Sequence, residues 1–120
     1  MRCRRPRGAL ASSALVLLLS LAGTAQGADP QLLARGEALF STVQPACAVC
    51  HTLTAAGSTG QVGPDLDELK PSAERVLQAV RNGLGVMPSF DGQISEQDMR
   101  ALAAFVAHAT GAAASASAPR

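Results

Sequence analysis

The chain has 120 residues, with ten Lys and Arg against nine Asp and Glu, and it contains no Trp or Tyr. This length suits one small domain, and a net charge of +1 without a basic run beyond the N-terminal segment argues against a nucleic-acid-binding protein. Three Phe residues supply all the aromatic bulk, so side chains alone predict a thin core.

The first 27 residues have the three parts of a secretory signal peptide. Arginines crowd the first seven positions, an apolar run follows from Ala9 to Ala22, and small residues lead to Gly27. The apolar run is shorter than the roughly 20 residues that a membrane-spanning helix requires, so we expect cleavage after Gly27 and no stable membrane anchor afterwards. The remaining 93 residues (120 minus 27) carry six basic and nine acidic side chains, a net charge of −3. The sequence therefore predicts a soluble, exported protein, periplasmic in a bacterium with two membranes.

Three helices are predicted in the mature chain. They begin at Asp29-Pro30, at Ser72 and at Ser95, where a residue suited to capping precedes an apolar repeat of three- and four-residue steps. The first should end at Pro45, the second at Asn82-Gly83 and the third at Gly111. The inward face of the second helix is predicted to hold Ala73, Val76, Leu77 and Val80.

The segment from Thr54 to Pro71 is rich in Gly, Pro, Ser and Thr and predicts a long loop without regular structure. No strand is predicted anywhere. Residues 111–120 are mostly Ala and Ser and are expected to form a flexible tail. Residues 28–110 are therefore expected to form a single domain.

Between the first helix and this loop, the segment Cys47-Ala48-Val49-Cys50-His51 places two thiols and an imidazole within five residues. A zinc site, a thiol–disulfide redox pair and a covalent haem attachment site all use such residues. A structural zinc site requires four ligands, and after export only His108 would remain to join these three. A thioredoxin-type pair opens a helix that follows a strand, and no strand is predicted before Cys47.

Covalent haem attachment explains the C-x-x-C-H spacing directly. One helical turn presents Cys47 and Cys50 to the two vinyl groups of the porphyrin, and His51 is then directed to the iron as its proximal ligand. The export signal agrees, because attachment of this kind occurs outside the bacterial cytoplasm.

A haem iron requires a partner for its histidine and a ligand on its other face. The carbonyl of Pro64, in Gly63-Pro64-Asp65-Leu66, is predicted to accept the second ring N–H of His51, although an ordinary Gly-Pro turn would account for the same residues. Met87 lies in a Gly- and Pro-punctuated loop and is the predicted sixth ligand, since methionine with histidine suits electron carriage. Met99 and His108 are better explained as helix packing and helix-end residues.

With these residues in place, the segment from Gly36 to Val106 resembles a class I monohaem c-type cytochrome. The resemblance rests on GEALF, CAVCH, GPDL, VMPSF and LAAFV. It implies an all-α, small cytochrome c fold whose helices pack around one covalently bound haem c. It also implies that the first and last helices cross where Gly36 and Phe40 face Phe105.

The same resemblance implies that Leu66 and Phe90 pack against the haem, which would supply the bulk that the core lacks. The aromatic side chains that usually contact the haem propionates in this family are absent here, so no residue is assigned to the propionates. The segment STVQPA before Cys47 is also longer than in short bacterial members.

The function predicted first is a one-electron carrier with a haem c ligated by His51 and Met87, an electron-transfer protein rather than an enzyme. Its negative mature surface favours redox partners with a positive patch. An alternative is the electron-accepting haem c subunit of a periplasmic dehydrogenase complex, because the stretch from Cys47 to Phe90 resembles the cytochrome subunits of sulfite dehydrogenases. A third alternative, a haem enzyme or gas sensor, requires an open sixth position without Met87.

Overall fold

The computed structural model describes residues 27–113, so residues 1–26 of the predicted signal peptide and residues 114–120 of the predicted tail lie outside the described residues. Of the tail predicted from Gly111, Ala112 is described and is buried rather than free in solution. The elements in chain order are α1 (Pro30–Thr42), α2 (Cys47–Cys50), β1 (Thr52–Leu53), the 3-10 helix η1 (Thr54–Ala56), β2 (Ser58–Thr59), α3 (Leu66–Leu69), α4 (Ala73–Asn82) and α5 (Glu96–Ala109). The fold is mainly helical, as predicted. Within residues 27–113, no helix has the length and apolar character that crossing a bilayer requires.

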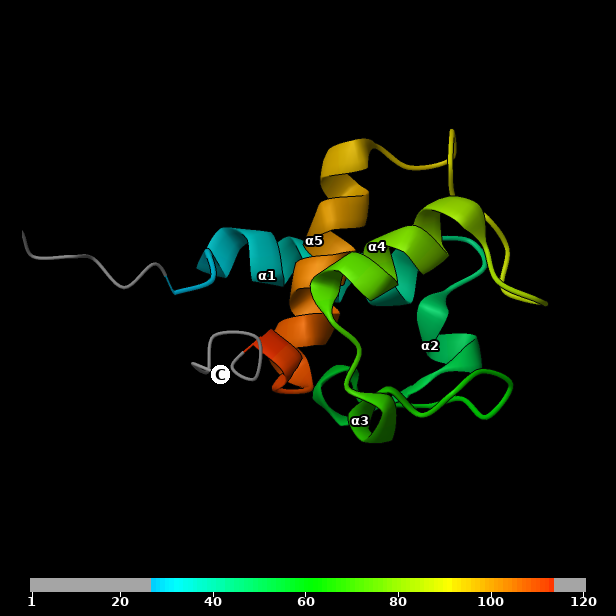
Figure 1. Ribbon diagram of the computed structural model, residues 1–120, viewed down its shortest axis with the longest axis horizontal. Coiled ribbons are helices and arrows are strands. Elements are labelled where there is room, and N and C mark those ends of the chain that lie inside the picture. Colours follow the sequence, from blue (N-terminus) through cyan, green and yellow to red (C-terminus); the bar gives the residue numbers. More distant parts are fainter. Residues whose placement is uncertain (1–26, 114–120) are drawn as a thin grey trace, which may run out of the picture.

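Helices α1 and α5 cross, and their contact forms one side of the core (Figure 1). Gly36 permits the close approach, because a Cβ at this position would lie 2.6 Å from the Cβ of Phe105 and would overlap the carbonyl oxygen of Ala101. The rings of Phe40 and Phe105 meet edge to face with their centroids 6.1 Å apart. The predicted crossing of the first and last helices is confirmed.

The predicted helix starts are also correct, because each rests on a local cap. The side chains of Asp29, Ser72 and Ser95 accept backbone N–H groups of the first turns of α1, α4 and α5 at 2.9, 3.2 and 3.0 Å. α1 ends at Thr42, before the predicted stop at Pro45. On α4 the prediction was wrong for Ala73, which is exposed.

The prediction of an irregular loop from Thr54 to Pro71 was wrong. β1 and β2 form a short antiparallel pair in which Thr52 is opposite Thr59 and Leu53 is opposite Ser58. The carboxylate of Asp67, in α3, accepts hydrogen bonds from the N–H and hydroxyl of Thr54 at 2.8 and 2.9 Å. These contacts fold the segment back beneath α2, where it supports the site described below.

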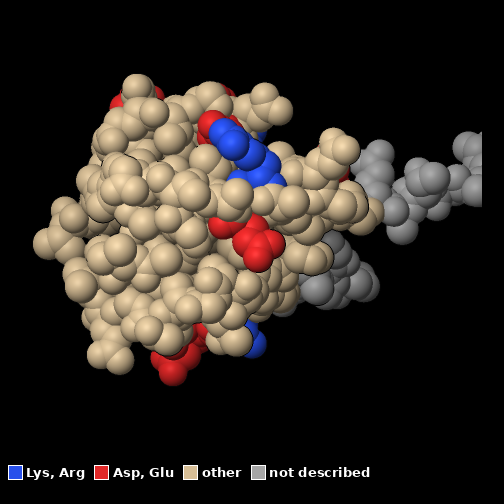
Figure 2. Space-filling model, turned by 180° about the vertical axis from the view of Figure 1, so that it is seen from behind, with Lys and Arg blue, Asp and Glu red and all other residues tan. Residues whose placement is uncertain are grey.

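Ion pairs connect the helices at the surface. Arg35 of α1 pairs with Asp98 of α5 at 2.8 Å, and Arg81 of α4 pairs with Glu96 of α5 at 2.6 Å. The hydrogen bonds from these arginines lower the pKa of both carboxyl groups. On the face shown in Figure 2, acidic and basic side chains are few and lie among a largely uncharged surface.

Candidate functional site

A cavity of about 320 Å³ lies between α2, α4 and α5, and most of the residues that the sequence singles out line it. Its walls are mainly apolar and include Phe40, Leu66, Val76, Val80, Phe90, Leu102 and Val106. Leu66 and Phe90, which were expected to pack on a cofactor, are 8% and 3% exposed and line this cavity. Such a concave, mainly apolar volume with a few polar groups is the usual form of a cofactor site.

The two cysteines of α2 form one edge of the cavity. Cys47 and Cys50 begin and end this single helical turn, and both are free thiols that are half-buried. Burial raises the pKa of the Cys47 thiol to about 11. A thiol–disulfide redox cysteine has a lowered pKa instead, so this environment opposes the redox-pair alternative.

His51 follows α2 directly and is held by backbone contacts. Its N–H donates to the carbonyl of Cys47 at 2.9 Å, and its Nδ1 lies 2.8 Å from the carbonyl oxygen of Pro64. A carbonyl can only accept, so Nδ1 carries the proton in this contact. In the neutral imidazole Nε2 then has the free lone pair that a metal requires. The contact predicted between His51 and Pro64 is present, and both residues line the cavity.

Two glycines that the sequence reasoning missed allow this packing. A Cβ on Gly63 would lie 2.5 Å from Cε1 of His51, and a Cβ on Gly60 would lie 2.6 Å from the carbonyl oxygen of Val49. The N–H of Gly63 also donates to the carbonyl of Cys50 at 2.7 Å. A loop rich in glycine beside C-x-x-C-H was the available signal, but only the fold shows which glycines contact the histidine.

The three candidates for the sixth ligand are separated by the fold. Met87 is half-buried and lines the same cavity as His51. Met99 is 3% exposed within the core around α5 and does not line the cavity. His108 is exposed near the end of α5.

The loop that carries Met87 is attached to the C-terminal end of α4. The hydroxyl of Ser89 donates to the carbonyl of Arg81 at 2.6 Å, and the N–H of Phe90 donates to the carbonyl of Val80 at 2.9 Å. Met87 and Leu84 exchange two backbone hydrogen bonds at 3.0 and 3.1 Å.

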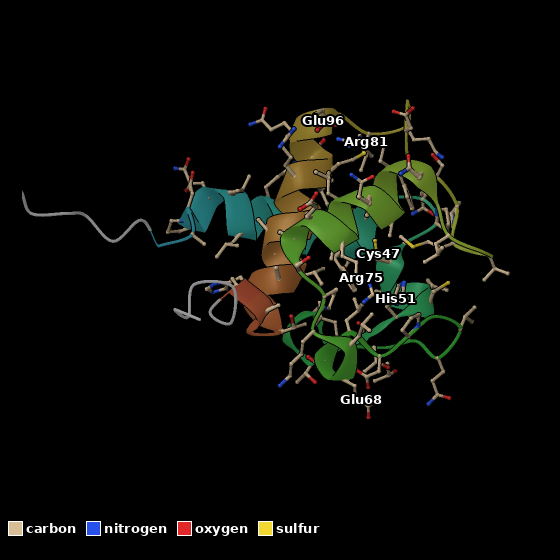
Figure 3. All side chains as sticks on the ribbon, in the orientation of Figure 1. Cys47, His51, Glu68, Arg75, Arg81 and Glu96 are labelled. Carbon is tan, nitrogen blue, oxygen red and sulfur yellow. The ribbon has the colours of Figure 1, made fainter. Side chains whose placement is uncertain are left out.

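These residues fit a haem c. Two thiols on one helical turn can form thioethers, an imidazole with a free Nε2 and a thioether sulfur can both bind iron, and the apolar walls suit a porphyrin. Cys47 and His51, labelled in Figure 3, both line this cavity.

Comparison with known proteins also indicates a haem c protein. Residues 31–106 match the protein family described as "Cytochrome C oxidase, cbb3-type, subunit III". The chain is 36% identical over 97 residues to cytochrome c6 of Synechocystis sp., covering 74% of this chain and 72% of that protein. It is 33% identical over 84 residues to cytochrome c6 of Chlorolobion braunii, covering 62% of this chain and 86% of that protein. The crystal structure of the c-type cytochrome SorU from Sinorhizobium meliloti matches with a TM-score of 0.66 and 44% identity, covering 69% of this chain and 95% of that chain.

Proposed function

The chain belongs to the monohaem c-type cytochromes, and we propose that His51 and Met87 are the axial ligands of its one covalent haem c, attached at Cys47 and Cys50. As a member of this family it is an electron-transfer protein and not an enzyme. The observation that supports the ligand assignment is that both thiols, the imidazole and the Met87 side chain line one apolar cavity. Histidine with methionine is the ligand pair that raises a haem potential for electron carriage.

When bound, the haem supplies an iron that gains and loses one electron. The chain holds the ligand side chains in place: the carbonyl of Pro64 orients His51, and the contacts of Ser89 hold the Met87 loop against α4. Leu66 and Phe90 exclude water from the cavity walls. Ligands held by backbone contacts move little when the charge of the iron changes, and this favours rapid electron transfer.

Replacing Met87 tests the ligand assignment. Met87→Ala should remove the Met–iron charge-transfer band, lower the reduction potential and allow carbon monoxide to bind the ferrous protein. Met99→Ala is the matched control, since Met99 is in the core away from the cavity, and it should lower stability while leaving the band and the potential nearly unchanged. Rapid carbon monoxide binding by the unmodified protein would instead favour the open sixth position of a haem enzyme or gas sensor.

We also propose that the protein is exported to the periplasm, with cleavage after Gly27, and exchanges electrons there with a protein partner. Leu84 and Val86, which precede Met87 and line the cavity, are 72% and 87% exposed. Such side chains favour brief apolar contact beside the cofactor. The mature charge of −3 favours a partner with a positive patch.

The finer alternative for the partner is a periplasmic dehydrogenase, such as sulfite dehydrogenase, to which this chain would supply the electron-accepting subunit. Its support is the resemblance of the stretch from Cys47 to Phe90 to such subunits. Size-exclusion chromatography of a native extract at low and high salt separates the two arrangements. A subunit should co-elute with a larger catalytic chain at both salt concentrations, whereas a free carrier should elute as a monomer at high salt.

A further inference from the structure

Arg75 places a positive charge in an otherwise apolar wall. It lies in the first turn of α4 and, among the described residues that line the cavity of Cys47, Cys50 and His51, it is the only Lys, Arg, Asp or Glu. Arg75 and His51, both labelled in Figure 3, line the same cavity. A guanidinium keeps its charge at every physiological pH, so a group bound here should be anionic on this side.

The described part of the chain offers Arg75 no carboxylate. Arg35, Arg81 and Arg100 each form a salt bridge, at 2.8, 2.6 and 2.8 Å, and no salt bridge within residues 27–113 includes Arg75. A cation in the first turn also lies at the positive end of the helix dipole, which disfavours it. Arg75 is exposed where it borders the cavity, and no ion pair within residues 27–113 accounts for its position there.

We propose that Arg75 binds a propionate carboxylate of the haem, an inference that rests on haem attachment at Cys47 and Cys50. The two propionates of haem are on the half of the macrocycle that does not bear the vinyl groups. Attachment at Cys47 and Cys50 would hold the vinyl edge at α2 and leave the propionate edge toward other walls of the cavity, to which α4 contributes Arg75. The donors of a guanidinium match a carboxylate with two parallel hydrogen bonds.

This contact has a measurable consequence for the reduction potential. A cation beside a carboxyl group lowers its pKa by about 1–3 units, so the paired propionate stays ionised across the neutral range. A propionate that gains a proton within this range changes the charge near the iron, and the potential then changes with pH. Arg75 should therefore make the reduction potential nearly independent of pH near neutrality. Its positive charge should also raise the reduction potential, because a nearby positive charge favours the ferrous state.

Redox titration of the holoprotein as a function of pH tests the contact. Arg75→Gln should lower the potential at neutral pH and move the inflection of the potential-against-pH curve upward by about 1–3 pH units. Lys70→Gln is the control, because Lys70 is an exposed cation at the end of α3 that does not line the cavity. Both variants lose one positive charge, so equal curves for the two would overturn the proposal.

An NMR titration of the unmodified holoprotein provides an independent measurement. One propionate should titrate well below the ordinary carboxyl range, and this difference should disappear in Arg75→Gln. If both propionates titrate normally in the unmodified protein, Arg75 does not bind either one. Acid–organic extraction tests attachment separately: release of the haem would contradict the thioethers at Cys47 and Cys50, whereas retained haem with unchanged titrations would contradict the Arg75 contact alone.

Discussion

Replacing Gly83 should weaken the bond between Met87 and the iron although residue 83 is not a ligand. Gly83 ends α4 with φ +72° and ψ 167°, a conformation that is essentially restricted to glycine. A Cβ at this position would lie 2.8 Å from the carbonyl oxygen of Met87 and 2.9 Å from the backbone nitrogen of Ser89. Both contacts are with backbone atoms, so the loop itself would have to move.

The expected magnitude follows from this geometry. A side-chain-bearing residue in such a conformation costs about 1–3 kcal/mol, which corresponds to roughly a 5- to 150-fold change in population. If Gly83→Ala destabilises the Met-bound loop by this amount, imidazole should displace Met87 from the ferric iron with an apparent affinity increased by the same factor. Imidazole titration, followed through the Met–iron charge-transfer band, measures it.

Gly85→Ala is the matched control in the same loop. Gly85 has φ +59°, but a Cβ there would have no heavy atom within 4 Å. Its substitution should therefore cost only the backbone preference, about 1–2 kcal/mol, without the overlap with Met87 and Ser89 that Gly83→Ala adds, so its effect on imidazole affinity should be the smaller one. The reasoning would be refuted if Gly83→Ala bound imidazole like the unmodified protein, or if Gly85→Ala had the larger effect.

Two further predictions concern the contact between α1 and α5. Gly36→Ala should lower stability by about 1–3 kcal/mol in chemical denaturation, because the added methyl group meets the backbone of Ala101, and an unchanged midpoint would contradict the close crossing. Asp98→Asn should destabilise the protein at pH 7 but progressively less below about pH 4. Arg35 lowers the pKa of Asp98 in the folded state. The ion pair therefore adds to the free energy of unfolding above the unfolded pKa, and this addition is lost as pH falls through the folded pKa. A stability difference between Asp98→Asn and the unmodified protein that persists in acid would contradict this assignment.

The parts of the fold that sequence predicts correctly are those with local causes. Asp29, Ser72 and Ser95 satisfy N–H groups within three residues, so their helix starts can be predicted without knowing the fold. The two-residue strands and α3 depend instead on contacts such as Asp67 with Thr54, 13 residues apart, and they have no periodicity to detect.

The residues of the candidate site also differ in how well the sequence alone predicts them. Cys47, Cys50 and His51 are adjacent in sequence, and Met87 is distinguished by its Gly- and Pro-rich loop. Arg75 is different, because it is exposed like Ala73 and yet lines the cavity. No cap or motif near residue 75 indicates that it borders a cavity formed by residues far away in the sequence.

Helix α4 therefore links two determinants of the haem environment. Its C-terminal carbonyls, at Val80 and Arg81, hold the Met87 loop, and its first turn carries Arg75. The side chain of Arg81 joins α4 to α5 through Glu96. A shift of α4 along α5 would move the methionine and the guanidinium together. If the proposed Met87 ligand and the proposed Arg75 contact both hold, the strength of the sixth ligand and the charge near the propionates are set jointly, by the packing of one helix rather than by two independent sites.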